Sequence, residues 1–306
     1  MARLASPRSI AIVAVVALAL AGAVSFLAGR GADSEAAEPL VRPNPVTGPF
    51  EGLGVWVDIY DAEAWNDPVG AVETMAGNGA RTVFLQSSNA DRTGPFAYPD
   101  ETAAFIEAAH DRGVQVVAWY LPHLTDLVVD RARARAAISF STPRGDRFDG
   151  FALDIESAAV RDPERRTQRL VDLSSRLREL AGDRYPLGAI VPSPVRLVDD
   201  LAFWPGFPWG DLARTYDAVL PMTYYTFRVH GPAETLGYVT RAVEEIHAGV
   251  GSDDVPVHVI GGLARDATGP ETIAFVRAVR DTGAIGASYY TLPFVTEEQW
   301  RVLGRM

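Results

Sequence analysis

Hydrophobic and polar positions follow two alternating patterns from Gly52 to the end of the chain. Short runs rich in β-branched residues predict strands, and the amphipathic stretches between them have the spacing of helices. The predicted strands are residues 54–59, 82–86, 114–119, 150–155, 187–191, 218–222, 255–260 and 285–289. The predicted helices are residues 68–77, 100–112, 163–181, 232–248 and 270–282. Asp162-Pro163 marks one helix start and Gly182 its end. Strands that alternate with helices indicate repeated βα units and a parallel sheet.

The number of units indicates the fold class. Eight units in roughly 250 residues match an α/β chain folded as a (β/α)8 TIM barrel. A doubly wound open sheet has fewer strands and a glycine-rich phosphate turn, and neither Gly-x-Gly-x-x-Gly nor a P-loop occurs here. In a barrel the residues that finish the strands form the active site. Asp149 and Asp217 instead precede their strands, so we expect them at the opposite face, where they stabilise the fold.

The N-terminal residues predict export. An apolar run over residues 10–28 follows Arg3 and Arg8. It is long for the core of a cleaved signal peptide and close to the roughly 20 residues that span a bilayer. We therefore expect residues 1–30 to be a signal anchor with its N-terminus inside, or a cleaved signal peptide. Residues 31–49 contain several prolines and predict a semi-extended linker, and the barrel should cover residues 50–306. The membrane is then contacted only by the N-terminal segment, and the barrel is extracellular, secreted or held at the cell surface.

Composition excludes several other classes of protein. The net charge of −11 argues against binding to nucleic acid. The chain has no cysteine, which excludes disulfides, thiolate metal sites and a lipid-modified cysteine. A hydrophobic content of 48% is ample for a large core, so the chain is not disordered.

The fourth predicted strand has one apolar face and one acidic face. Side chains alternate along a strand, so Ala152, Asp154 and Glu156 share a face and the apolar residues between them share the other. Two carboxyl groups roughly 6.5 Å apart along a strand each raise the cost of ionising the other, which is typical of a proton-donating acid. The alternative is a structural pair of acids bonded to Arg or Tyr side chains.

Aromatic and polar side chains gather where the predicted strands end. A mouth of this kind suits a ligand with flat apolar faces and many hydroxyl groups, which describes an oligo- or polysaccharide. The candidate substrate-binding residues are Trp56, Tyr60, Gln86, Trp119, Met222, Tyr225, Tyr289 and Tyr290. Alternatively, several of these side chains cap the barrel core.

Two segments carry a resemblance to a known family. Residues 149–156 resemble the strand-four motif Asp-Gly-x-Asp-x-Asp-x-Glu of the chitinase-like glycoside hydrolases, family 18, and match four of its five fixed positions. Residues 216–224 are similar to the strand-six signature of that family. The resemblance implies a TIM-barrel glycosidase in which Glu156 protonates the glycosidic oxygen, Asp154 orients an acetamido group of the substrate and Tyr224 steadies that group.

The sequence also departs from the family pattern. Ala152 stands where the motif has its first inward Asp, and Tyr225 stands where an acid often follows the strand-six Tyr. The Ser-x-Gly-Gly signature of strand three is missing as well. These differences indicate a divergent branch of glycosidase-like barrels.

The position of the two acids limits the mechanism. Glycosidases that use two protein carboxyl groups hold them about 5–5.5 Å or roughly 6.5–9.5 Å apart across the scissile bond. Asp154 and Glu156 project from one strand, so an opposing carboxylate or a nucleophile on the substrate is required. We expect Asp58, at the end of the first strand, to be the best opposing candidate, with Asp61 and Asp126 less well placed.

The sequence is compatible with three functional hypotheses. The leading one is an exported glycoside hydrolase that acts on an extracellular or cell-wall polysaccharide, with Glu156 as general acid and no cofactor. The second is a carbohydrate-binding barrel without catalytic activity, because Ala152 replaces an Asp of the family motif. The third is a metal-dependent hydrolase with Asp58, Asp154 and Glu156 as ligands; it ranks last because no His-x-His or paired His motif occurs.

Overall fold

The computed structural model describes residues 39–306, and these residues form one compact unit. The predicted export segment and the first part of the linker lie outside the described residues.

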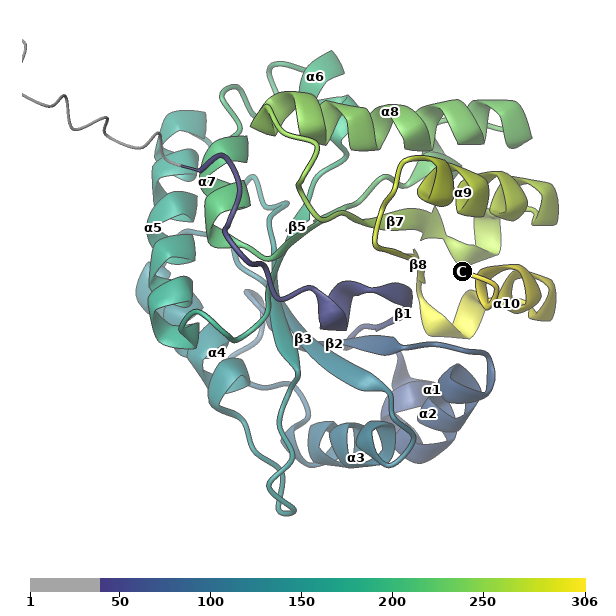
Figure 1. Cartoon of the computed structure of the whole chain (residues 1–306). Coiled ribbons are helices and arrows are strands. Elements are labelled where there is room, and N and C mark those ends of the chain that lie inside the picture. The colour runs from purple at the N-terminus through teal and green to yellow at the C-terminus, as the bar shows by residue number, and fades with distance from the viewer. Residues whose placement is uncertain (1–38) are drawn as a thin grey trace, which may run out of the picture. The chain divides into compact units, whose positions relative to one another are not determined.

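Eight parallel strands form the centre of this unit (Figure 1). They are β1 (Gly52–Val57), β2 (Thr82–Asn89), β3 (Gln115–Leu121), β4 (Gly150–Asp154), β5 (Leu187–Val191), β6 (Ala218–Pro221), β7 (His258–Leu263) and β8 (Gly286–Tyr290). The hydrogen-bonded order runs from β6 through β1 to β8 and β7, and bridges from Val219 to Val257 and from Met222 to Ile260 join its two ends. The predicted barrel of eight parallel strands is confirmed.

Helices surround the strands, as expected for βα units (Figure 1). The five predicted helices are present as α2 (Pro68–Gly77), α3 (Pro99–His110), α5 (Pro163–Ala181), α8 (Pro232–Val250) and α9 (Gly269–Asp281). The side chain of Asp162 accepts a hydrogen bond from the Arg165 amide and so caps α5. Further helices, which the sequence pattern did not predict, are α1 (Ala62–Asn66), α4 (Leu127–Ser139), α6 (Pro194–Asp199), α7 (Trp209–Thr215) and α10 (Glu297–Leu303). Four 3-10 turns complete the structure: η1 (Gly48–Phe50), η2 (Tyr225–Phe227), η3 (Ala264–Asp266) and η4 (Leu292–Phe294).

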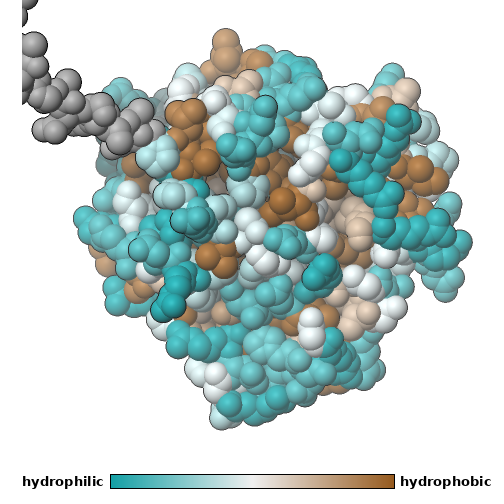
Figure 2. Space-filling model, in the orientation of Figure 1, coloured by the Kyte–Doolittle hydropathy of each residue, from teal (hydrophilic) through white to brown (hydrophobic). Residues whose placement is uncertain are grey.

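The surface of the barrel is mixed in polarity. On the face drawn in Figure 2, apolar positions lie scattered among hydrophilic ones. None of the helices between Pro39 and Met306 has the length and apolar composition that crossing a bilayer requires.

Alternation along the strands divides the core into two layers. Residues such as Phe151 and Leu153 point outward and pack in the layer beneath the helices. Inward residues such as Phe84 and Ala152 fill the barrel interior. Phe50 closes the N-terminal end of this interior, where the first segment of the described chain crosses the barrel (Figure 1). A Cβ on Gly188 would approach the Phe50 ring to 2.8 Å, so glycine is needed there.

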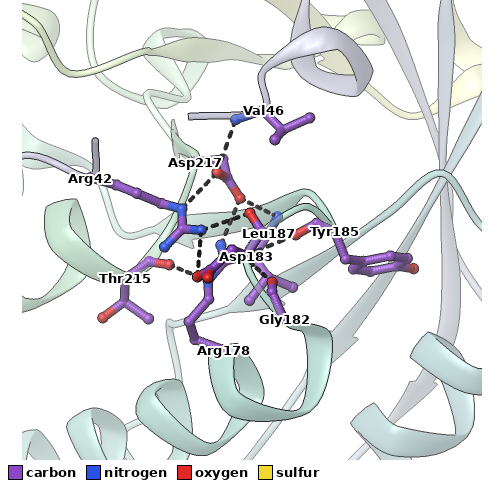
Figure 3. A network of polar contacts seen from close by, with 9 residues as sticks. All are labelled: Arg42, Val46, Arg178, Gly182, Asp183, Tyr185, Leu187, Thr215 and Asp217. Carbon is purple, nitrogen blue, oxygen red and sulfur yellow. Dashed lines mark hydrogen bonds and ion pairs between the residues drawn. The ribbon is translucent and has the colours of Figure 1, made fainter. Parts of the chain in front are cut away.

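The N-terminal face is fastened by a buried ionic network around Asp217 (Figure 3). One carboxylate oxygen accepts hydrogen bonds from Arg42 Nε at 3.0 Å and from the Val46 amide at 3.0 Å. The other accepts from Arg178 Nη2 at 2.6 Å and from the Leu187 amide at 2.8 Å. The carboxylate is fully buried. The network ties the segment before Phe50 to the barrel, and the expected structural role of Asp217 agrees with it.

Candidate active site

The acidic pair lies at the carboxyl end of β4. Asp154 is the last residue of the strand and Glu156 follows it after one residue. The Ile155 amide donates a hydrogen bond to the Ile190 carbonyl at 2.7 Å, which continues the ladder between β4 and β5 past the end of β4. Both acids therefore keep the inward direction of Ala152. Asp154 is only 5% exposed, whereas Glu156 reaches solvent.

The surroundings of the pair favour its protonated forms. Burial raises the pKa of Asp154 well above its ordinary value, and the nearby charge of Glu156 raises it further. Burial also raises the pKa of Glu156. Within the described residues, Asp154 Oδ1 is buried without a hydrogen-bond partner, which costs less for a neutral carboxyl than for a carboxylate. At least one proton therefore stays on the pair at pH values where exposed carboxyl groups have lost theirs.

Tyr224 lies beside these acids. It has left-handed backbone angles, φ 43° and ψ 50°, which are uncommon for a residue with a side chain and are often found at functional sites. Burial raises the pKa of Tyr224, and the negative charges of Asp154, Glu156 and Asp58 add to the effect. Its hydroxyl therefore stays protonated and can donate a hydrogen bond to a substrate.

Asp58 is linked to the same group of residues through Tyr290. The Tyr290 hydroxyl donates a hydrogen bond of 2.6 Å to Asp58 Oδ2, and the Tyr60 amide donates one of 2.7 Å to Asp58 Oδ1. The rings of Tyr224 and Tyr290 lie 6.4 Å apart. The structure thus brings Asp58, Asp154, Glu156, Tyr224 and Tyr290 together at the C-terminal mouth.

A cavity of about 170 Å³ opens beside Glu156. Met222 and Tyr224, two of the expected site residues, line it together with Glu156. Sequence reasoning missed the rest of its lining, which comes from the chain after β5 and β6: Pro192, Ser193, Arg196, Phe203, Thr223, Phe227 and Arg228. These residues belong to a loop, a turn and the short helix α6, and the only sequence signal for them was the aromatic run that ends at Phe227.

Three expected substrate-binding residues belong instead to the barrel interior. Trp56 and Trp119 are 2% and 4% exposed, and their indole N–H groups donate to Ser288 Oγ and to the Phe84 carbonyl. Gln86 is also buried, and its side-chain oxygen accepts a hydrogen bond from the Ile59 amide at 3.0 Å. The expectation that these three side chains contact substrate was wrong, because they lie below the mouth and are enclosed by their neighbours.

Tyr225 and Tyr289 also lie away from the mouth. Their hydroxyl groups bond to each other at 2.6 Å in the layer between strands and helices, packed on Phe275. Tyr289 follows the alternation of β8, and Tyr225 lies in the turn η2; both pack in the outer layer, whereas Tyr224 and Tyr290 pack against the inner one. Their assignment to the substrate site is therefore corrected.

The other candidate residues lie at the rim or cap helices. Tyr60 is 70% exposed at the rim, with the Arg92 guanidinium 5.8 Å from its ring centre. Asp61 and Asp126 accept hydrogen bonds from the first amides of α1 and α4, so they cap helices. Between residues 39 and 306, no three His, Asp or Glu side chains are grouped so that they could hold a metal ion. The metal-dependent alternative therefore lacks a ligand set in this part of the chain.

Comparison with known proteins adds evidence on the fold. No family model and no curated protein matches the sequence. Solved structures do match. The glycoside hydrolase domain of PgaB (BpsB) from Bordetella bronchiseptica has a TM-score of 0.57 at 16% identity, over 83% of this chain and 98% of that one. A GH18 chitinase from Cycas revoluta in complex with (GlcNAc)3 has a TM-score of 0.60 at 11% identity, over 83% and 98%. The chain has a chitinase-like TIM-barrel fold.

Other matches extend beyond chitinases. The spore cortex-lytic enzyme SleL of Bacillus cereus has a TM-score of 0.61 at 12% identity, over 83% of this chain and 73% of that one. The resemblance that the strand-four and strand-six motifs indicate is confirmed for the fold. At identities this low, the shared fold does not identify the substrate of this protein, because one barrel fold supports many activities.

Proposed function

We propose that this protein is an exported glycoside hydrolase that acts on an extracellular or cell-wall polysaccharide, with Glu156 as general acid. The observation that carries the proposal is the pair of acids at the end of β4, which faces the mouth and has raised pKa values for both members. A general acid must hold a proton near neutral pH and still reach the leaving oxygen. Burial raises the pKa of Glu156, so it keeps its proton to higher pH than an exposed glutamate does, and its position beside the cavity lets it reach a ligand.

The neighbouring groups take supporting roles in this mechanism. Asp154 is the more buried member of the pair, and burial together with the nearby charge of Glu156 raises its pKa, so it retains a proton beside the general acid. The Tyr224 hydroxyl donates a hydrogen bond to the sugar. The nucleophile is either a group of the substrate or Asp58, which Tyr290 and the Tyr60 amide hold in one orientation.

A hydrolysis screen tests the proposal directly. The wild-type chain is incubated with a panel of polysaccharides, and each substrate that it cleaves is repeated with Glu156→Gln. General acid catalysis predicts a loss of turnover of at least about 10²-fold, with unchanged thermal unfolding. Glu179→Gln, on the exposed side of α5, is the matched control and should retain turnover. Near wild-type turnover by Glu156→Gln would refute the assignment.

A catalytically silent sugar-binding barrel is the second candidate. The observation that favours it is Ala152, which is fully buried among the apolar side chains of the interior where the family motif has an Asp. The same screen separates the two candidates. A wild-type chain that binds a glycan and cleaves none supports the silent barrel, whereas cleavage that depends on Glu156 supports the hydrolase.

Export is tested separately from chemistry. Residues 1–30 should direct the barrel out of the cytoplasm, because two arginines precede the apolar run. Cell fractionation followed by mass spectrometry of the mature N-terminus distinguishes an anchor from a cleaved signal peptide. Full-length protein recovered from the soluble cytoplasmic fraction would contradict the proposal.

A further inference from the structure

Two arginines border the cavity beside Glu156. Arg196 lies on α6 after β5, and Arg228 follows η2 after β6, so different segments of the chain bring them to one cavity. Glu156 is the only acid that lines it with them among the described residues. Two arginines and one acid therefore line this cavity in a protein whose net charge is −11.

Neither guanidinium forms a close ion pair within the described residues. The Arg228 side chain makes no hydrogen bond or ion pair to any residue from 39 to 306, although its backbone amide is fixed by a 2.7 Å bond to the Tyr225 carbonyl. Arg196 has only a loose, exposed ion pair, with its Nε 3.9 Å from Asp200 Oδ2. Glu156 does not pair with either arginine in this part of the chain. Both side chains thus remain free to bind an anion.

Arg196 lies against an aromatic ring. Its guanidinium lies over the Phe203 ring, 3.7 Å from the ring centre. A guanidinium that stacks by its face keeps the N–H groups at its edge available in one plane, which is the geometry that binds carboxylate or phosphate with two parallel hydrogen bonds. Lysine would lack this geometry.

The size and charge of the cavity define what it would hold. A volume of about 170 Å³ is small for a ligand pocket and suits one ring or substituent rather than an oligosaccharide. Charges farther away than about 8 Å are largely screened at physiological salt, so the acids elsewhere on the molecule have little influence here. Glu156 and the exposed Asp200 are the acids beside the two arginines. An acidic group of a ligand in this cavity would lie next to the two guanidinium groups.

We infer that the sugar next to Glu156 carries an anionic substituent, a carboxylate or a phosphate, which Arg196 and Arg228 bind. The inference rests on the proposed glycosidase function and narrows its substrate class to acidic glycans. Arg228 and Arg196 are specificity residues in this scheme, and Glu156 remains the proton donor.

A binding experiment tests the inference without depending on turnover. Full-length Glu156→Gln protein is applied to an array of uronate-bearing and phosphorylated oligosaccharides, each printed beside its neutral counterpart made by carboxyl reduction or phosphatase treatment. We expect binding to the acidic member of a pair, weakened at least about 10-fold by Arg228→Gln and by added salt. Arg228→Lys should recover part of the affinity, because lysine restores the positive charge but not the parallel N–H groups of the guanidinium. The uronate and phosphate arms identify which anion is bound.

Controls separate a binding role from a structural one. Arg277→Gln, which alters an exposed arginine on α9, should bind like the parent, and all variants should keep the parent's unfolding midpoint. Equal binding to both members of every pair, binding of neutral glycans alone, no acidic binder on the array, or no effect of Arg228→Gln would each overturn the inference. Loss of turnover in Glu156→Gln tests the proposed function separately, so the two claims fail independently.

Discussion

Replacing Asp217 by Asn should lower the free energy of unfolding by about 3–5 kcal/mol, because the change leaves buried charge without its partner. The carboxylate is inaccessible to solvent and accepts four hydrogen bonds, two of them from arginines whose side chains are 11% and 12% exposed. Charge-assisted hydrogen bonds contribute about 1.5–3 kcal/mol each, so the two from arginine contribute about 3–6 kcal/mol, which overlaps that range. The asparagine would also direct an N–H group at one of the former donors.

Urea unfolding followed by circular dichroism measures this change. The midpoint should fall with little change in the slope, since the surface exposed on unfolding stays the same. Asp183→Asn is the matched control: this acid also contacts Arg42, at 3.3 Å, but is 93% exposed, so its loss should cost less than about 1 kcal/mol. A double-mutant cycle of Asp217→Asn with Arg42→Ala should show coupling between the two sites. A loss below about 1 kcal/mol for Asp217→Asn would refute the reasoning.

Two further predictions concern the acids at the mouth. The native pKa of Asp154 is raised, so the folded state binds its proton more tightly than the unfolded chain and stability falls as pH rises above the unfolded pKa of about 3.9. Asp154→Asn should therefore gain stability relative to wild type as the pH rises above about 4, measured by thermal melts, and melts that stay parallel with rising pH would contradict this. The same change should lower turnover and move the basic limb of the pH–rate profile to lower pH. Tyr290→Phe removes the donor to Asp58 and should cost about 0.5–1.5 kcal/mol of stability, and it should lower kcat with little change in KM if Asp58 takes part in the reaction; an unchanged kcat leaves Asp58 as a loop-stabilising residue.

The period of the strands made much of this fold predictable. All eight strands appear, and the alternation that puts Asp154 and Glu156 on one face is seen in the two layers of the core. The same alternation separates Tyr290 from Tyr289. A period of two fixes the side of the sheet on which each residue lies.

The period does not fix depth along the barrel axis. Trp56 and Asp58 both point inward, yet Trp56 fills the interior while Asp58 reaches the mouth. Arg196 and Arg228 could not be placed from sequence either, because their positions depend on how the chain after β5 and β6 packs on the barrel. Depth and loop conformation are tertiary properties, and they decide which inward side chain meets a ligand.

The filled interior limits how a ligand can enter and leave the site. Phe50 closes one end, and the stacked rings of Trp56 and Phe84, 4.3 Å apart, occupy the axis above it. His258 adds to this plug through hydrogen bonds to the Phe50 carbonyl and Ser288, and burial lowers its pKa to about 4, so it stays neutral. A polymer therefore cannot thread along the barrel axis. A polymeric substrate of the proposed hydrolase would have to lie across the open end, and its fragments would leave through the same opening.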